Sequence, residues 1–304
     1  MTRPRRSVLY MPGANAKALA KGRSLPADAL ILDLEDSVAP DMKALARLQA
    51  CEAARTGGFG RREVVIRVNG PYTPWGREDF LAAIAARPDA ILLPKIESAG
   101  EVMRAARELR EAGAPETIRL WAMMETPLAM LNAGSIAATA ADPLSRLDVL
   151  VMGLNDLAKE TRARLTLGRA AFTPWLAQCV AAARAHHCDI VDGVFNAIGD
   201  EKGFRSECEQ GRDFGFDGKT LIHPSQIEAS NEIFAPSAAE IAQARAIVEV
   251  FARPENAGLG VIQLDGRMVE RLHEEMARRT LLIAEGIDAL SASLGALATA
   301  AKTV

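Results

Sequence analysis

The sequence predicts an α/β protein, a (β/α)8 TIM barrel with a C-terminal helical cap. Eight short apolar runs alternate with longer segments of helical period, which is the order of elements in such a barrel. Runs such as Ala29–Leu32 and Val149–Met152 are almost continuously apolar, as expected of strands buried on both faces of a parallel sheet. A doubly wound open sheet is the less favoured alternative, because no G-x-G-x-x-G follows the first strand.

The strands expected in chain order share β-rich composition and short length. They are Ser7–Met11, Ala29–Leu34, Glu63–Val68, Ala90–Pro94, Arg119–Met124, Leu147–Met152, Ile190–Phe195 and Lys219–Ile222. Between them lie Ala-, Leu-, Arg- and Glu-rich segments of helical period, for example Asp41–Arg55, Ser98–Glu111 and Thr173–His187.

The pattern changes after the eighth strand. A helix is expected over Ser237–Arg253, followed by a small apolar run that ends in the turn-prone dipeptide Asp265-Gly266. A long amphipathic segment, Arg267–Ser291, precedes an Ala-rich tail that we expect to fray. We therefore predict a barrel over residues 1–234 that carries the site, and a cap or lid over residues 235–304.

Bulk composition points to a soluble, cytoplasmic globular protein. The 304 residues carry a net charge of -3 and 49% hydrophobic residues, so no basic bias suggests nucleic acid. No segment is expected to approach a membrane span, and the apolar stretch behind the basic start is too short for a secretory signal. The four cysteines have no metal-ligand spacing and are expected to be reduced and mostly packed.

Two acidic side chains suggest a metal site. Glu125 and Asp156 each follow an apolar run and open a helical one, so they are expected at the same end of neighbouring parallel strands. Chemistry in such barrels occurs at the C-terminal ends of the strands. Two carboxylates without a rival Cys/His set suit an oxygen-liking cation such as Mg²⁺.

Other polar residues are expected at the same rim, namely Glu35, Asp36, Arg67, Asn69, Lys95, Glu97, Asn196 and His223. Single residues also have ordinary explanations. Glu125 and Asp156 could simply lie at helix starts, and Arg67 could form a structural ion pair. Asp265 is by the same reasoning a turn residue. Their common position favours function, because carboxylates packed so densely would repel one another unless a cation neutralised them.

Eight motifs, spread in order from the first strand into the cap, resemble one family. They are Arg6–Gly13, Leu32–Val38, Arg67–Gly70, Pro94–Ser98, Glu125–Pro127, Gly153–Leu157, Gly218–Ile227 and Leu264–Val269. Together they resemble the HpcH/HpaI aldolase superfamily, in particular its citrate lyase β-subunit-like branch with the malyl-CoA and citramalyl-CoA lyases.

The resemblance implies a Mg²⁺-dependent enzyme, with Mn²⁺ as a possible substitute, that acts on a CoA thioester. Glu125 and Asp156 would be the metal ligands, and the backbone amides of Gly153, Leu154 and Asn155 would meet the substrate carboxylate. Arg67 would hold the thioester carbonyl and the oxo-acid oxygen. Glu35 and Asp36 would orient Arg67 and metal-bound water. Asp265 would be the acid/base, lent by a neighbouring subunit of a homotrimer or hexamer.

On this basis the sequence predicts a carbon–carbon lyase that cleaves a citramalyl-CoA- or malyl-CoA-type substrate to acetyl-CoA and a 2-oxo acid. Three alternatives stay open. The chain could be a citrate lyase β subunit acting on a citryl thioester of acyl carrier protein, a malyl-CoA thioesterase, or a non-catalytic acyl-CoA-binding barrel. Neither the acyl group nor the residues that contact CoA follow from the sequence.

Overall fold

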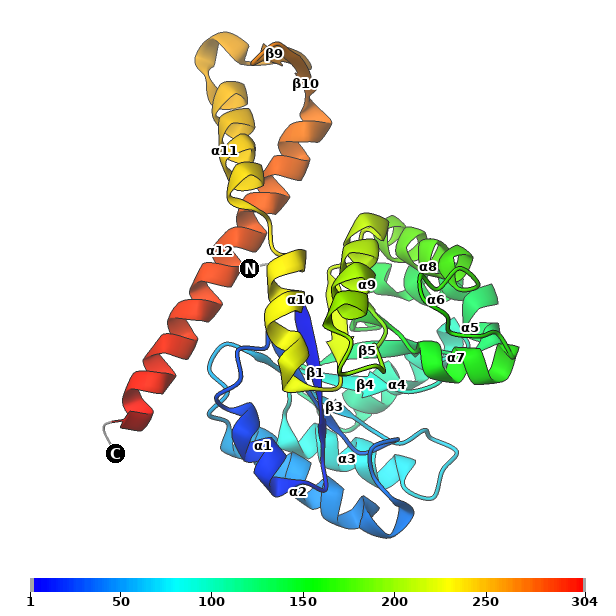
Figure 1. The fold of residues 1–304 in the computed structure, drawn as a ribbon. Helices are drawn as coiled ribbons and strands as arrows, with labels where there is room; N and C mark the ends of the chain where they lie inside the picture. The colour runs from blue at the N-terminus through cyan, green and yellow to red at the C-terminus, as the bar shows by residue number, and fades with distance from the viewer. Residues whose placement is uncertain (1–2, 303–304) are drawn as a thin grey trace.

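Eight parallel strands close into a barrel at the centre of the computed structural model, which describes residues 3–302 (Figure 1). The first strand pairs with both the second and the eighth, so the sheet has no edge. This confirms the predicted TIM barrel and excludes the open sheet. The strands are β1 (Ser7–Pro12), β2 (Ala29–Asp33), β3 (Glu63–Arg67), β4 (Ala90–Leu93), β5 (Arg119–Met124), β6 (Leu147–Met152), β7 (Asp189–Asp192) and β8 (Gly218–Leu221).

Helices cover the outside of the barrel and bury an apolar layer against the strands. Each strand is followed by one or two of them. They are α1 (Ala16–Gly22), α2 (Lys43–Thr56), α3 (Gly76–Ala86), α4 (Ala99–Glu111), α5 (Pro127–Leu131), α6 (Ala133–Ala138), α7 (Leu154–Thr161), α8 (Thr173–Ala185), α9 (Glu201–Phe214) and α10 (Ile227–Phe234).

Alternate residues of each strand point into the barrel, where small and branched side chains fill the interior. Ala29 and Ile31 of β2 belong to this inner cluster, so Asp33, two residues further on, also faces inward at the C-terminal mouth. The same alternation brings aromatic, charged and small residues of other strands to that level. They are Tyr10 of β1, Arg67 of β3, and Glu125 and Gly153, which directly follow β5 and β6.

The C-terminal segment forms a cap with its own apolar cluster. It comprises α11 (Ala238–Ala252), a two-stranded hairpin of β9 (Val261–Leu264) and β10 (Arg267–Glu270), and α12 (Arg271–Lys302). The long amphipathic segment expected from Arg267 is helical only from Arg271, because residues 267–270 pair with β9. The predicted turn at Asp265-Gly266 is present, with both residues at positive φ.

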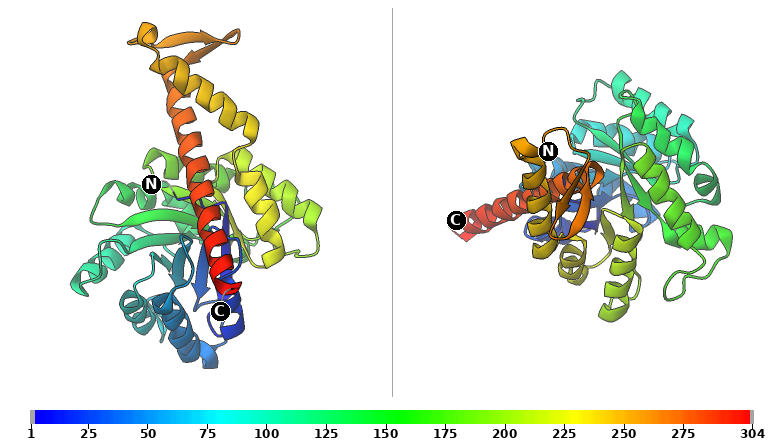
Figure 2. Two further views of the ribbon diagram at one scale, coloured as in Figure 1. Left: turned by 90° about the vertical axis from the view of Figure 1, so that its left-hand side faces the viewer. Right: turned by 90° about the horizontal axis from the view of Figure 1, so that it is seen from above.

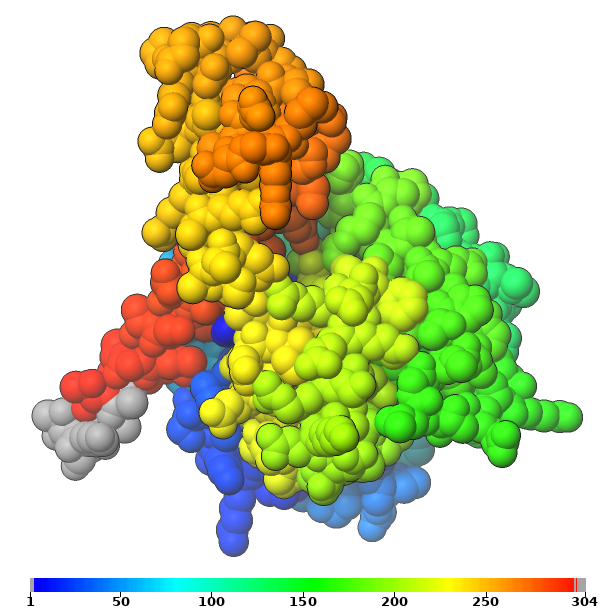
Figure 3. Space-filling view, turned by 45° about the horizontal axis from the view of Figure 1, so that its top comes forward, coloured from blue at the N-terminus to red at the C-terminus, as the bar shows by residue number. Residues whose placement is uncertain are grey.

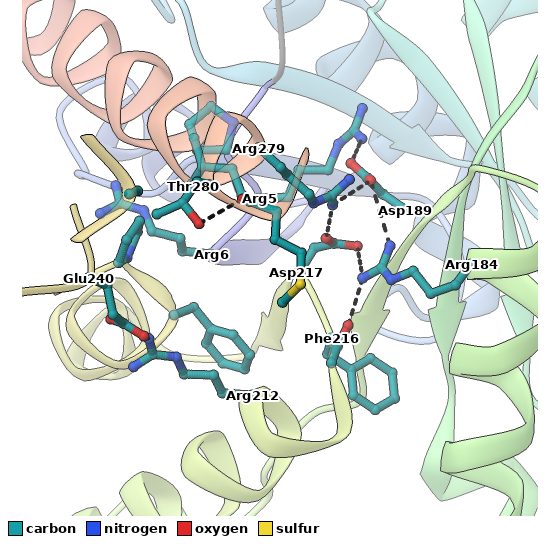
Figure 4. A pocket seen from close by; sticks show the side chains of 18 of the residues that line it. Arg5, Arg6, Arg184, Asp189, Arg212, Phe216, Asp217, Glu240, Arg279 and Thr280 are labelled. Carbon is teal, nitrogen blue, oxygen red and sulfur yellow. Dashed lines mark hydrogen bonds and ion pairs between the residues drawn. The ribbon is translucent and has the colours of Figure 1, made fainter. Parts of the chain in front are cut away.

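The cap packs against the N-terminal end of the barrel, opposite the mouth that carries the polar rim (Figure 2). A cavity of about 480 Å³ lies between the cap and this end of the barrel, and Figure 4 shows residues that line it. Arg279 of α12 crosses it to Asp217, which directly precedes β8, at 2.9 Å. The hairpin stands clear of the barrel as a separate lobe (Figure 3).

Helix α12 contradicts one expectation from the sequence. Its stretch Arg271–Leu297 is long and apolar enough to cross a membrane by length and composition, although no segment was expected to approach a span. Only 6% of its most apolar window is buried within the chain. A single helix of this kind is weak support for a membrane span, since an apolar face that packs on another protein surface passes the same test.

Candidate active site

Arg67 is the centre of the polar rim. Its Nε and Nη2 donate to the two carboxylate oxygens of Asp33 at 2.6 and 2.7 Å, a bidentate pair between two buried side chains. The two residues are cross-strand partners in the β2–β3 register. The guanidinium also lies over the Tyr10 ring, 4.8 Å from its centroid. Arg67 is thus fixed in orientation before any ligand binds.

The predicted partners of Arg67, Glu35 and Asp36, follow β2 and reach the same guanidinium. Nη1 of Arg67 lies 2.8 Å from Glu35 and donates to Asp36 at 3.2 Å. Oε2 of Glu35 is buried but has no hydrogen bond among the described residues, because it lies off the N–H directions of Arg67. The other oxygen of Glu35 accepts from Lys95 Nζ at 2.9 Å.

Glu125 is buried at the end of β5, with 1% of its surface exposed. Its Oε1 accepts the backbone N–H of Lys95 at 2.8 Å. Gly153, the residue after β6, leaves the space that Glu125 occupies: a Cβ at this position would lie 2.5 Å from the Glu125 side chain. The glycine is therefore required for the close approach of the two strand ends.

Burial and, to a smaller extent, the negative charge of Glu35 raise the pKa of Glu125 to about 8, although Lys95 and Arg67 oppose the rise. Burial also raises the pKa of Glu35. Asp33 behaves differently: burial favours its neutral form, but the charge and hydrogen bonds of Arg67 outweigh burial and lower its pKa. Ionisation is therefore less favourable for Glu125 and Glu35, and more favourable for Asp33, than for an exposed carboxylate.

Asp156 lies in the first turn of α7, 3.8 Å from Lys95 Nζ. The predicted role of the Gly153 amide in binding the substrate does not fit the structure, because that N–H donates to the Met124 carbonyl at 3.0 Å. The amides of Leu154 and Asn155 open the helix, where N–H groups have no intrahelical partner. The Asn155 side chain is paired with Asn196 at 2.7 Å.

The residues present fit a divalent cation at Glu125 and Asp156. Four carboxylates share two cations at ion-pairing distance, Glu125 has no ion pair among the described residues, and one buried oxygen of Glu35 has no hydrogen bond. No cluster of three or more His, Cys, Asp or Glu side chains suited to a metal occurs within residues 3–302. Two carboxylates are a usual protein contribution to a Mg²⁺ shell that substrate and water complete.

Asp265 is the one predicted site residue that the fold does not bring to the rim. It is exposed at the tip of the β9–β10 hairpin, with φ of +49°. The hairpin packs on α11 and α12 and extends from the N-terminal end of the barrel (Figures 1 and 2). Asp265 therefore cannot serve the site of its own chain in this arrangement.

Two functional positions were missed in the sequence. Asp33 lies inside the motif Leu32–Val38, yet only the β2–β3 register shows that it, rather than Glu35 or Asp36, is the bidentate partner of Arg67. Lys95 was recognised as a rim residue but not as the cation that joins Glu35 to Asp156. The signal for Asp33 was a single acid at the end of an otherwise apolar strand.

A closed (β/α)8 barrel whose C-terminal mouth holds an arginine among surplus carboxylates is the framework of a barrel enzyme with a cation-binding site. The family model for HpcH/HpaI aldolase/citrate lyase matches residues 6–224. The chain belongs to this family, as the motifs indicated.

Known relatives cover nearly the whole chain. A protein of Cereibacter sphaeroides named (3S)-malyl-CoA thioesterase is 50% identical over 95% of this chain and 98% of its own length. Citrate lyase subunit beta of Escherichia coli is 33% identical over 93% of this chain and 94% of its own. The structure of CitE from Mycobacterium tuberculosis with magnesium, acetoacetate and coenzyme A has a TM-score of 0.71 at 27% identity, covering 93% of this chain and 98% of that one.

These similarities correct the predicted reaction. The sequence analysis favoured a carbon–carbon lyase, but relatives named as thioesterases match at 50% identity, well above the 33% of the citrate lyase subunits. The prediction failed because its motifs indicate a cation site and an arginine but no particular reaction. Such groups suit hydrolysis of a thioester as well as cleavage of a carbon–carbon bond.

Proposed function

We propose that this protein is a Mg²⁺-dependent thioesterase that hydrolyses a short 3-hydroxyacyl-CoA with a second carboxylate, such as (3S)-malyl-CoA. The single observation that carries the proposal is the 50% identity, over 95% of the chain, with relatives named (3S)-malyl-CoA thioesterase. The carboxylate-rich mouth supports it, because an anionic hydroxy acid would need a cation between itself and these side chains.

Glu125 and Asp156 would hold Mg²⁺, or Mn²⁺ in its place, and the ion would supply charge neutralisation and polarisation of substrate oxygens. Arg67 would donate to the thioester carbonyl oxygen as negative charge develops there. Nε and Nη2 of Arg67 donate to the two carboxylate oxygens of Asp33, and a guanidinium has five N–H groups, so others would be available to the substrate. Glu35 and Asp36 would complete this orientation.

Hydrolysis adds one water across the thioester. The water oxygen bonds to the carbonyl carbon, the carbon–sulfur bond breaks, and the sulfur leaves with a proton as the CoA thiol. A carboxylate able to take the proton from water is needed near the carbonyl. We assign this role to Asp265 of a second copy of the chain, because Asp265 does not reach the rim of its own barrel.

Exposed apolar side chains on the hairpin support its insertion against another copy. Met268 of β10 is 70% exposed, and Val261 of β9 and Leu259 are about half exposed. Apolar residues also lie exposed in the segments that follow β5 and β6, among them Leu131 at the end of α5 and Leu167 between α7 and α8. Burying such surfaces against each other would stabilise a homo-oligomer, a trimer or hexamer, in which each hairpin meets a neighbouring mouth.

The activity test is to offer purified protein (3S)-malyl-CoA with Mg²⁺ and with EDTA, and to separate the products. The expected result is free CoA and malate in equal amounts, with Mg²⁺ only. Acetyl-CoA and glyoxylate in place of free CoA would overturn the proposal. A citryl thioester of acyl carrier protein as the sole substrate would also overturn it.

The shared site is tested by mixing two inactive variants, Asp265→Ala and Glu125→Ala, and letting subunits exchange. If Asp265 acts across the interface, mixed oligomers regain activity because some mouths combine an intact Glu125 with an intact Asp265 of the neighbour. A mixture of Asp265→Ala with Asp265→Ala/Glu125→Ala is the matched control and should stay inactive. No regain in the first mixture after proven exchange would contradict the assignment.

A further inference from the structure

Lys95 connects three carboxylates that come from different strands. It follows β4 and has a left-handed backbone, with φ of +50°. This conformation accompanies a backbone N–H that donates to Glu125 at 2.8 Å. Its ammonium donates to Glu35 at 2.9 Å and lies 3.8 Å from Asp156. One residue thus contacts both candidate metal ligands, by its backbone and by its side chain.

The ammonium of Lys95 is the more exposed of the two cations at this mouth. Arg67 is buried and fixed by its bidentate bond to Asp33, whereas 41% of the Lys95 side chain is exposed. A lysine side chain has three freely rotating donors on a flexible stem, so it can leave one carboxylate while keeping another. A divalent ion at Glu125 and Asp156 would place two positive charges near the ammonium and repel it.

We propose that Lys95 is a positioning residue that acts as a built-in counter-cation, holding Asp156 in place in the metal-free site and competing with the divalent metal for it. When the metal binds, the ammonium withdraws from Asp156 and stays on Glu35, while the backbone N–H continues to fix Glu125. Lys95 therefore lowers metal affinity in the free protein and keeps the ligands ordered until the metal arrives. This inference rests on the cation site of the proposed function.

The test is metal binding to the substrate-free protein, with MgCl₂ by calorimetry and MnCl₂ by electron paramagnetic resonance. Lys95→Gln removes the competing charge, and we expect about tenfold tighter binding of either metal at low salt, with a smaller gain at high salt. Lys95→Arg keeps the charge and should stay near the parent affinity. Lys202→Gln, an exposed lysine on α9, controls for the loss of one charge.

Thermal stability gives a second measurement. Without metal, Lys95→Gln should melt below the parent because Asp156 loses its cation and Glu35 retains only Arg67. With saturating MgCl₂ the difference should shrink. A purely structural role would instead lower the melting temperature in both states and weaken metal binding. Unchanged or weaker binding by Lys95→Gln, or equal gains in Lys95→Gln and Lys95→Arg, would overturn the inference.

These outcomes are separable from failure of the proposed function. Parent protein that binds MgCl₂ but does not hydrolyse (3S)-malyl-CoA would end the thioesterase proposal, while tighter binding by Lys95→Gln would still support the role of Lys95. Parent protein that binds neither metal would overturn both.

Discussion

The two ends of the barrel hold the same residue types in different proportions. At the C-terminal mouth, four carboxylates share two cations within ion-pairing distance, Arg67 and Lys95, and Glu125 adds a fifth carboxylate without an ion pair among the described residues. At the N-terminal end the charges balance, and six carboxylates meet six arginines. The carboxylates are Asp28, Glu63, Asp89, Asp148, Asp189 and Asp217, and the arginines are Arg3, Arg5, Arg6, Arg119, Arg184 and Arg279.

The difference separates a structural cluster from a binding site. A neutralised cluster has no need of a further ion, so the arginines of the N-terminal end serve to close the barrel and to attach the cap. The mouth carries a negative surplus that costs stability unless a cation joins it. Substitutions at the N-terminal end should therefore change stability, and those at the mouth should change binding and turnover.

The largest effect is expected from Arg5→Met at the N-terminal end. Arg5 is 6% exposed, donates to Glu63, Asp148 and Asp189, and lies 5.3 Å from the Trp121 ring. Its loss leaves the buried Glu63 with the half-exposed Arg3 at 3.7 Å, and a buried charge that loses its close partner typically costs about 3–5 kcal/mol. Urea unfolding followed by tryptophan fluorescence measures this cost. Hydrolysis per folded molecule should stay within about twofold, and a large fall would break the distinction between the ends.

At the mouth, Arg67→Lys should give the complementary result. Lysine retains the charge but not the bidentate fork, so the thioester carbonyl loses an oriented donor. Removing one such donor typically lowers kcat about 10²–10³-fold. The free energy of unfolding should fall less than in Arg5→Met, because Asp33 keeps a cation. Steady-state kinetics with (3S)-malyl-CoA, alongside urea unfolding, makes the comparison; a stability loss without a kinetic one would contradict it.

The pH dependence of metal binding sharpens the same contrast. Since burial raises the pKa of Glu125 to about 8, this ligand must lose a proton before it binds Mg²⁺. Mg²⁺ affinity should fall by up to about tenfold for each pH unit below that value. The folded state binds more protons than the unfolded state between the two pKa values of Glu125, so metal-free stability should decrease as pH rises through this range.

Melting curves with EDTA and with MgCl₂ between pH 6 and pH 9 test this prediction. The stabilisation by Mg²⁺ should grow as pH rises. Glu125→Gln, which has no titratable group at this position, should show neither the growing Mg²⁺ effect nor the decrease in metal-free stability that Glu125 causes. A Mg²⁺ effect that is independent of pH in the parent protein would show that Glu125 is already ionised in the metal-free site.

The barrel could be predicted from the sequence because each parallel strand is a continuous apolar run with clear breaks. The eight expected strands lie within three residues of the observed ones. Helix α11 was equally clear, since Ser237 begins a capping box with Glu240. Strand β10 was not, because Arg-Met-Val-Glu is short and half polar, and only its pairing with β9 makes it a strand.

The site was harder to predict, because its side chains are selected by register and not by local pattern. Glu125 and Arg67 could be placed at one rim from strand order alone. The bond between Arg67 and Asp33 required the pairing of β2 with β3, and the engaged amide of Gly153 required the position of β5 beside β6. The reaction is harder still to predict from the sequence, because the same charged groups suit both hydrolysis of a thioester and cleavage of a carbon–carbon bond.

The smallest effect is expected where the cap meets the N-terminal end of the barrel. Arg279 of α12 bonds to Asp217, but 53% of its side chain is exposed, so solvent screens the pair and it contributes at most about 1 kcal/mol. Burial raises the pKa of Asp217, as does the charge of Asp189, and Arg184 opposes the rise. Arg279→Gln should therefore hardly change global unfolding, because Arg184 still neutralises Asp217.

The same substitution should nevertheless loosen the cap. Hydrogen exchange in α12 reports local opening that global unfolding does not show, and it should become faster in Arg279→Gln. Arg278→Gln is the matched control, because within residues 3–302 this neighbouring arginine pairs with Glu274 of its own helix and not with the barrel. Faster exchange in Arg279→Gln alone would show that the ion pair between Arg279 and Asp217 holds the cap against the N-terminal end of the barrel. Equal exchange in both variants would mean that the apolar contacts between α11 and α12 hold the cap without it.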